Sequence, residues 1–178
     1  MPEHSSIFRI ALIGPESTGK TTLCECLAKH YQTIFNPEYS RAYVENLDRK
    51  YLESDVIHCL MAQTSLEKQL IQKANKILFA DTEAIMAGVW LKDVFNNSSS
   101  LIEKYISEYP YDLYLLTLPD LAFENDPVRE NPHRRDYFFN WYEQELLKRK
   151  LPYTIIRGTG QERLRMAIHA IDHHIQHN

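Results

Sequence analysis

Two kinds of apolar pattern alternate along this chain. Short, nearly continuous apolar runs have the length of strands buried on both faces, and longer segments between them carry apolar residues at the spacing of a helix with one buried side. The runs lie at 7–13, 33–35, 77–81, 112–117 and 153–156, and the helical segments at 20–30, 56–71, 83–91, 101–106, 133–150 and 161–168.

Strands that alternate with helices indicate a parallel sheet with right-handed crossovers and helices on both faces. The predicted fold class is therefore α/β, with three layers built around a five-stranded parallel sheet. A chain of 178 residues has the size of one domain, so we expect a single domain over 1–178.

The turn after the first strand carries the most specific pattern, Gly14-Pro15-Glu16-Ser17-Thr18-Gly19-Lys20-Thr21. The spacing G-x-x-x-x-G-K-[ST] between a strand and a helix is that of a phosphate-binding P-loop, in which backbone N–H groups point at a polyphosphate. Lys20 would reach the β- and γ-phosphates of ATP. The residues expected to bind the nucleotide are Gly14, Glu16, Ser17, Thr18, Gly19, Lys20, Thr21 and Thr22.

A carboxylate at the end of the third strand predicts a magnesium site. Asp81 follows four apolar residues, as expected for the acidic residue that holds the metal shell of P-loop enzymes, and the hydroxyl of Thr21 would be a second ligand. Asp81 could also, or instead, cap the helix that begins near residue 83.

Glu38 follows the second strand, which we expect beside the first, at the edge where ligands bind in such folds. It could accept a proton from a substrate hydroxyl as that hydroxyl attacks the γ-phosphate. The alternative is a surface carboxylate paired with Arg41. Arg41 emerges at the same edge, and Gln63, on the next predicted helix, could either face a ligand or be exposed to solvent.

A charged, proline-containing stretch at about 121–136 has the composition of a lid. Arg129, Arg134 and Arg135 could neutralise the transferring phosphoryl group there, or they could be ordinary surface charges. After the fifth strand, Arg157 and Gly158 could lie against adenine or form a plain turn.

The composition restricts the class of partner. The net charge is −4, which argues against nucleic acid. No segment has the length of a membrane span, and the first residues do not look like a signal peptide, so we expect a cytoplasmic protein. The three cysteines are expected to be free thiols, and His169 and His173 to lie on a solvated helix face in preference to a metal site.

The P-loop alone leaves several enzyme classes open. A GTPase would carry N-K-x-D after a strand, whereas Asn75-Lys76-Ile77-Leu78 lacks the aspartate and precedes one. A hydrolytic motor usually has an acidic residue after the strand-end aspartate, where this chain has Thr82. A small-molecule kinase fits better. A nucleotide sensor that changes its contacts with a partner is the alternative from another class.

The chain resembles the ribosylnicotinamide kinase domain of NadR-type NAD salvage proteins over nearly its full length. The shared residues are the loop 14–23, Pro37-Glu38-Tyr39-Ser40-Arg41 with Tyr43-Val44, Gln63, Asp81-Thr82 with Trp90, Asp126-x-x-Arg129, and Gly158 with Glu162-Arg163. The resemblance implies phosphorylation of nicotinamide riboside to nicotinamide mononucleotide with Mg²⁺ and ATP.

The cationic pyridinium ring of that substrate would favour aromatic faces, and Tyr39, Tyr43 and Trp90 belong to the site-forming segments, although aromatic residues there could equally be core. The chain departs from the family pattern at Ala84, Met86, Ala87 and Phe123. These changes touch the expected substrate pocket and leave open a kinase for another nucleoside or small alcohol. The adenylyltransferase and DNA-binding domains often fused in this family are not expected in this chain.

Overall fold

The computed structural model describes residues 7–124 and 132–177. Its strands are β1 (Phe8–Ile13), β2 (Ile34–Asn36), β3 (Ile77–Asp81), β4 (Leu113–Thr117) and β5 (Tyr153–Ile156). Its helices are α1 (Lys20–His30), α2 (Tyr39–Glu45), α3 (Glu53–Leu70), α4 (Ala84–Phe95), α5 (Ser100–Glu108), α6 (Arg135–Arg149) and α7 (Gly160–His177). The five predicted strands are all present.

The strands form one parallel sheet in the order β2-β3-β1-β4-β5. The central strand β1 pairs with β3 on one side and β4 on the other. Because β3 lies between β1 and β2, the expectation that the second strand neighbours the first is wrong. Asp81 at the end of β3 therefore lies between the P-loop and the segment that carries Glu38.

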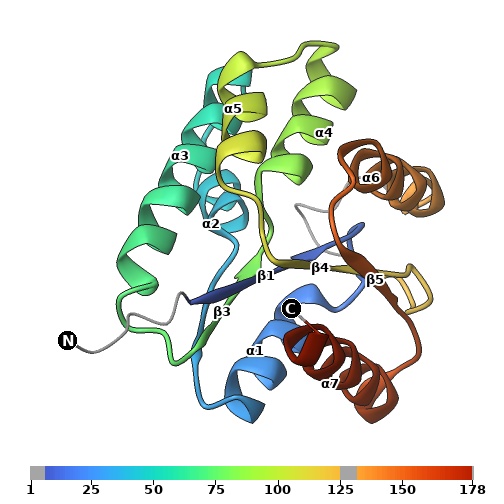
Figure 1. Ribbon diagram of the computed structural model, residues 1–178. Coiled ribbons are helices and arrows are strands. Elements are labelled where there is room, and N and C mark those ends of the chain that lie inside the picture. Colours follow the sequence, from blue (N-terminus) through green and yellow to red (C-terminus); the bar gives the residue numbers. More distant parts are fainter. Residues whose placement is uncertain (1–6, 125–131, 178) are drawn as a thin grey trace.

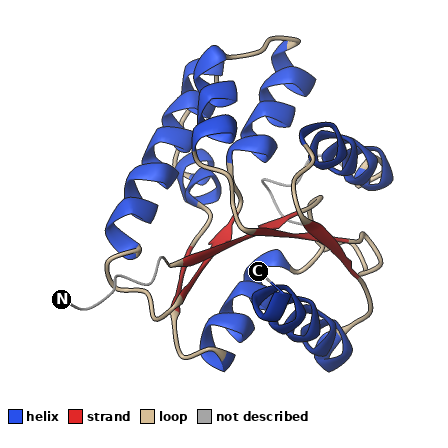
Figure 2. Ribbon diagram, in the orientation of Figure 1, coloured by secondary structure: helices blue, strands red, loops and turns tan. Residues whose placement is uncertain are grey.

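Two hydrophobic cores cover the two faces of the sheet, which confirms the three-layer prediction (Figures 1 and 2). Ile10 and Leu12 of β1 pack in the core formed with α1 and α7. Ala11 and Ile13 point the other way, into the core formed with α3, α4, α5 and α6. This alternation follows from the period of two along a strand.

Helix α2 was not predicted, and the reason lies in its pattern. None of its residues is buried, so it lacks the apolar stripe by which a helix is recognised in a sequence. Helix α3 begins before the predicted helical segment 56–71. The helix begins at Glu53, and the Asp55 carboxylate accepts the backbone N–H of Leu52 from within the first turn, at 2.7 Å.

Other predictions concern single features of the described residues. Cys24 and Cys59 are buried free thiols, and Cys26 is a partly buried one. His169 and His173 stack on α7 with their ring centroids 6.4 Å apart, and within 7–124 and 132–177 no cluster of three or more potential metal ligands occurs. No helix in these ranges is both long and apolar enough to span a bilayer.

Candidate functional site

The P-loop is held against the end of β4. Gly14 has a backbone φ of 146°, and a Cβ placed on it would lie 2.2 Å from the Thr117 Oγ1 atom. A side chain at position 14 would therefore collide with the neighbouring strand. Gly19, with φ of 73°, supplies the left-handed turn immediately before α1.

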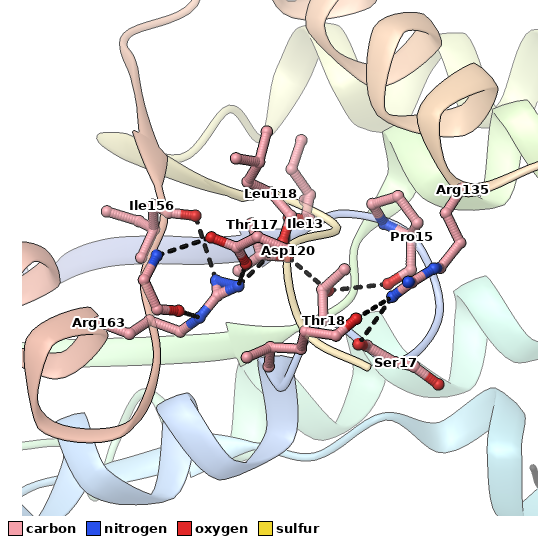
Figure 3. Close-up of polar contacts among 12 residues, drawn as sticks. Ile13, Pro15, Ser17, Thr18, Thr117, Leu118, Asp120, Arg135, Ile156 and Arg163 are labelled. Atoms are coloured by element: carbon pink, nitrogen blue, oxygen red, sulfur yellow. Dashed lines mark hydrogen bonds and ion pairs between the residues drawn. The ribbon is translucent and has the colours of Figure 1, made fainter. Parts of the chain in front are cut away.

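Buried hydroxyl groups hold the loop in shape through hydrogen bonds (Figure 3). The Thr18 Oγ1 atom lies 2.8 Å from the Pro15 carbonyl oxygen and 2.7 Å from the Thr117 Oγ1 atom. Thr117 in turn contacts the Ile13 carbonyl oxygen at 3.1 Å. Because Thr18 and Thr117 are almost fully buried, these bonds are shielded from water and favour a preformed loop.

Lys20 opens helix α1 and folds over the loop. Its Nζ atom donates to the carbonyl oxygens of Gly14 and Pro15, at 2.9 and 2.8 Å. The ammonium group therefore lies at the mouth of the loop, beside the N-terminus of a helix. Both features favour a bound polyphosphate.

Thr21 and Asp81, the two predicted magnesium ligands, lie in contact with each other. The Thr21 hydroxyl donates to the Asp81 Oδ2 atom at 2.5 Å. The Asp81 Oδ1 atom is buried and has no hydrogen-bond partner among the described residues. A hydroxyl and a carboxylate with a spare oxygen are donors that Mg²⁺ prefers, so these two residues fit the predicted metal.

The charge state of Asp81 depends on its surroundings. The pKa of its carboxyl group is raised to about 6, mainly by burial and also by the nearby carboxylate of Glu38. Lys20 and the hydrogen bond from Thr21 act in the opposite direction. A cation bound here would favour the ionised carboxylate that a metal ligand requires.

The interpretation of Asp81 as a helix cap is wrong, because Glu83 caps α4. Its carboxylate accepts the backbone N–H groups of Ile85 and Met86, at 2.8 and 3.2 Å. Burial raises the pKa of Glu83 to about 7, although the two N–H groups oppose this shift. Glu83 also lines a cavity beside the P-loop, and no motif in the sequence marks it as a site residue.

A cavity of about 730 Å³ extends from the P-loop in two directions, toward β2 and β3 on one side and toward β4 and β5 on the other. All the predicted P-loop residues line it. On the side of β2 and β3 its wall includes apolar side chains, namely Tyr51, Val56, Leu60, Met86, Ala87, Trp90, Phe138 and Tyr142. On the side of β4 and β5 it is lined by Leu121, Gly160, Gln161, Arg163 and Leu164.

Glu38 lines this cavity from the residue before α2. Its Oε1 atom accepts a hydrogen bond from the Ser40 hydroxyl at 2.7 Å. Arg41, which also lines the cavity, forms an ion pair with Glu45 at 3.1 Å. Glu38 therefore belongs to the cavity wall, and its role as a base stays a prediction.

Gln63 is 6% exposed, so the interpretation of it as a solvent-facing residue is wrong. Its Oε1 atom accepts the backbone N–H of Tyr39 at 2.8 Å, and its Nε2 atom donates to the Asp81 carbonyl oxygen at 3.3 Å. Both ends of the amide are therefore engaged with the protein, although the residue borders the cavity.

The predicted aromatic contacts divide into two groups. Trp90 lines the cavity and packs edge-on against Tyr51, with ring centroids 5.0 Å apart. Tyr39 and Tyr43 do not line the cavity, and both pack against His58 of α3. Substrate contact by Tyr39 therefore stays a prediction without support from this arrangement.

Two of the three predicted lid arginines are described, and both border the cavity. Arg134 forms a two-point ion pair with Asp93, with distances of 2.5 and 2.9 Å. Arg135 donates to the backbone carbonyl oxygens of Ser17 and Leu121, which ties the start of α6 to the P-loop (Figure 3). Arg129 lies outside the described residues, as does part of the predicted lid.

The turn after β5 has a structural role that the sequence analysis missed. Arg163 is buried and donates to the carbonyl oxygens of Ile156, Gly158 and Leu118, and it also pairs with Asp120 (Figure 3).

The second carboxylate oxygen of Asp120 accepts the Gly158 N–H at 2.7 Å. Arg157 and Gly158 lie outside the cavity lining, so a contact between these two residues and adenine stays a prediction. The pair Glu162-Arg163, noted only as part of the resemblance, was the available signal for this arrangement.

Comparison with known proteins places this site in a family. A family model described as "AAA domain" (AAA_28) matches residues 9–163. The trifunctional NAD biosynthesis/regulator protein NadR of Salmonella typhimurium is 28% identical over 126 residues, which are 67% of this chain and 30% of that protein.

Solved structures extend the comparison. A crystal structure of NadR in complex with NR has a TM-score of 0.84 and 26% identity, and covers 97% of this chain and 53% of that one. A deoxyadenosine kinase from M. mycoides, at 13% identity and a TM-score of 0.61 over 93% of this chain and all of its own, shares the fold. The chain thus spans only part of its NadR relatives. It belongs to the AAA domain family AAA_28 and is homologous to NadR, with an α/β P-loop fold of the kinase type.

Proposed function

We propose that this chain transfers the γ-phosphoryl group of ATP to nicotinamide riboside and forms nicotinamide mononucleotide. The observation that carries the proposal is that one cavity brings together a preformed P-loop, the Glu38 carboxylate and an apolar end that contains Trp90. Homology to NadR, and the solved NadR with bound NR, support the choice of substrate.

The phosphate end of the cavity would hold ATP. Backbone N–H groups of the P-loop and the N-terminus of α1 would contact the β- and γ-phosphates, with Lys20 as the cationic partner. Thr21 and Asp81 would hold Mg²⁺, which when bound would offset the negative charge of the phosphates. Arg134 and Arg135 border the same space and could add positive charge during transfer.

Glu38 would be the base in this reaction. As a ribose hydroxyl oxygen forms a bond to the γ-phosphorus, its proton passes to the Glu38 carboxylate, and the bond from the γ-phosphorus to the β,γ-bridging oxygen breaks to release ADP. Ser40 donates to the Oε1 atom of Glu38 and holds the side chain at the cavity wall, which leaves Oε2 to receive the proton.

The apolar end of the cavity suits a flat, cationic ring. Trp90 offers an aromatic surface, and Tyr51 packs against it and holds its orientation. A pyridinium ring would gain from contact with the aromatic face. Met86 and Ala87, two of the departures from the family pattern, also line this end, so a different nucleoside is the second candidate.

A panel of nucleosides with Mg²⁺ and ATP tests the proposal. Purified protein should convert nicotinamide riboside to its monophosphate faster than it converts adenosine, cytidine, uridine or thymidine, with products identified by mass spectrometry. Fast turnover of another nucleoside without turnover of nicotinamide riboside would assign the second candidate. Binding of ATP without phosphorylation of any of them would favour a nucleotide sensor.

A further inference from the structure

Gln63 connects the two segments that carry the proposed base and the proposed metal ligand. It lies on α3, and its amide oxygen accepts the N–H of Tyr39, the residue directly after Glu38. Its amide nitrogen donates to the carbonyl oxygen of Asp81. A single side chain is therefore bonded to the backbone on both sides of the reaction site.

The orientation of this amide follows from its partners. The Tyr39 N–H can only donate and the Asp81 carbonyl oxygen can only accept, so only one of the two amide orientations satisfies both groups. A second buried amide joins the same region, because Asn36, at the end of β2 and fully buried, donates to the backbone carbonyl oxygen of Gln63 at 3.1 Å. The ends of β2 and β3, the start of α2 and the middle of α3 are thereby joined.

Removal of this link would leave polar groups without partners. Gln63 is 6% exposed and Asp81 is fully buried, so water cannot easily replace the lost hydrogen bonds. Helix α2 has no buried residue of its own, so its position depends strongly on such polar contacts. A shift of α2 would move Glu38, and a shift at the end of β3 would move the Asp81 carboxylate.

We propose that Gln63 is a positioning residue that fixes the separation of Glu38 from Asp81 for phosphoryl transfer. The inference rests on the proposed function, in which these two carboxylates act on the hydroxyl and on the metal. It differs from a substrate-binding role, because both ends of the amide are already bonded to the backbone. A small displacement of a catalytic group lowers the rate strongly even when the substrates still bind.

The decisive variant is Gln63→Met, which has a similar length but neither donor nor acceptor. We expect kcat to fall by about 10- to 100-fold, as for residues that orient metal ligands, with the KM of the nucleoside changed by less than about threefold. Gln63→Glu keeps an acceptor for the Tyr39 N–H but places a carboxylate oxygen against the Asp81 carbonyl oxygen, so we expect its kcat to fall as well. Gln69→Met, an exposed change on the same helix, is the matched control and should behave like wild type.

Hydrogen exchange provides a readout that does not depend on the substrate. Amides of the segment 37–46 should exchange faster in Gln63→Met than in wild type, because Tyr39 has lost its acceptor, and Gln69→Met should show no change. If Gln63→Met does not fold, Gln63→Glu carries the test through its kcat and through the exchange of the segment after Asp81.

Three results would overturn the inference. For Gln63→Met, these are unchanged hydrogen exchange at 37–46, a kcat within about twofold of wild type, or an increase of KM with kcat unchanged. The last result would indicate that Gln63 binds the substrate. Wild-type protein assayed in parallel separates failure of the Gln63 inference from failure of the proposed function. If wild type phosphorylates a different nucleoside, the kcat comparison is made with that one, and if it phosphorylates none, hydrogen exchange alone decides whether Gln63 holds α2.

Discussion

Glu38 is the residue on which the proposed chemistry depends most. Glu38→Gln keeps the size of the side chain and an acceptor for the Ser40 hydroxyl, but it removes the group that takes the proton. We expect kcat to fall by about 10²- to 10⁴-fold, the usual contribution of a general base, with little change in melting temperature. Glu108→Gln, at the exposed end of α5, is the control. Equal kcat values for Glu38→Gln and wild type would exclude Glu38 as the base.

Thr82 follows Asp81 and stores backbone strain at the cavity wall. Its φ is 80°, which a β-branched residue rarely adopts, and its buried hydroxyl has no hydrogen-bond partner among the described residues. Thr82→Gly should therefore raise the free energy of unfolding by about 1 kcal/mol, after the entropic cost of glycine is deducted. We expect lower kcat in the same variant, because strain at a functional site usually serves positioning. A loss of stability in urea denaturation would contradict this prediction.

At the scale of elements, the Arg163 side chain joins the ends of β4 and β5 to the start of α7. Arg163→Met would remove the donor from three backbone carbonyl oxygens and leave Asp120 without its cation. Because Arg163 is 4% exposed, we expect a loss of about 3 kcal/mol of unfolding free energy, measured by chemical denaturation. Arg165→Met, an exposed change two residues along the same helix, should cost little. Similar losses of unfolding free energy in the two variants would show that the hydrogen bonds and the ion pair of Arg163 do not stabilise the fold.

Asp55, in the first turn of α3, should make the stability of the protein depend on pH. Hydrogen bonds from Arg49, the Leu52 N–H and the Tyr43 hydroxyl hold the pKa of Asp55 well below its usual value near 4. The pKa is lower in the folded state than in the unfolded one, so Asp55 contributes stability above about pH 4 and loses it as the pH falls through the folded value.

Asp55→Asn should therefore have a lower melting temperature than wild type at pH 7. Its melting temperature should also fall less than that of wild type when the pH is lowered from about 5 to about 2. The melting temperatures of both proteins across this range are the measurement. Parallel curves for the two proteins would contradict the assignment of the ion pair between Arg49 and Asp55 as the cause.

For the whole molecule, the features that could be predicted from the sequence were local ones. The P-loop has fixed spacing over eight residues, and the strands are continuous apolar runs, so both are visible without knowledge of the fold. A rule about strand ends in α/β sheets placed Thr21 and Asp81 at the same edge, and the two side chains are in contact there, while their role as metal ligands stays a prediction.

The features that were missed depend on contacts between distant residues. Gln63 bonds to residues 24 positions before it and 18 positions after it, and no sequence pattern marks such a link. Helix α2 has no buried face and is held mainly through polar and aromatic contacts to α3. The Arg163 cluster likewise exists only once β4 and β5 lie side by side.

The central claim is that the P-loop and the apolar end of one cavity hold the two substrates of a single phosphoryl transfer. The most direct test measures ADP and nicotinamide mononucleotide formed from Mg²⁺, ATP and nicotinamide riboside. We predict that both products appear at equal rates, and that Lys20→Met reduces the rate by about 10²- to 10³-fold while the exposed change Lys29→Met does not. Formation of ADP without nicotinamide mononucleotide would contradict the claim.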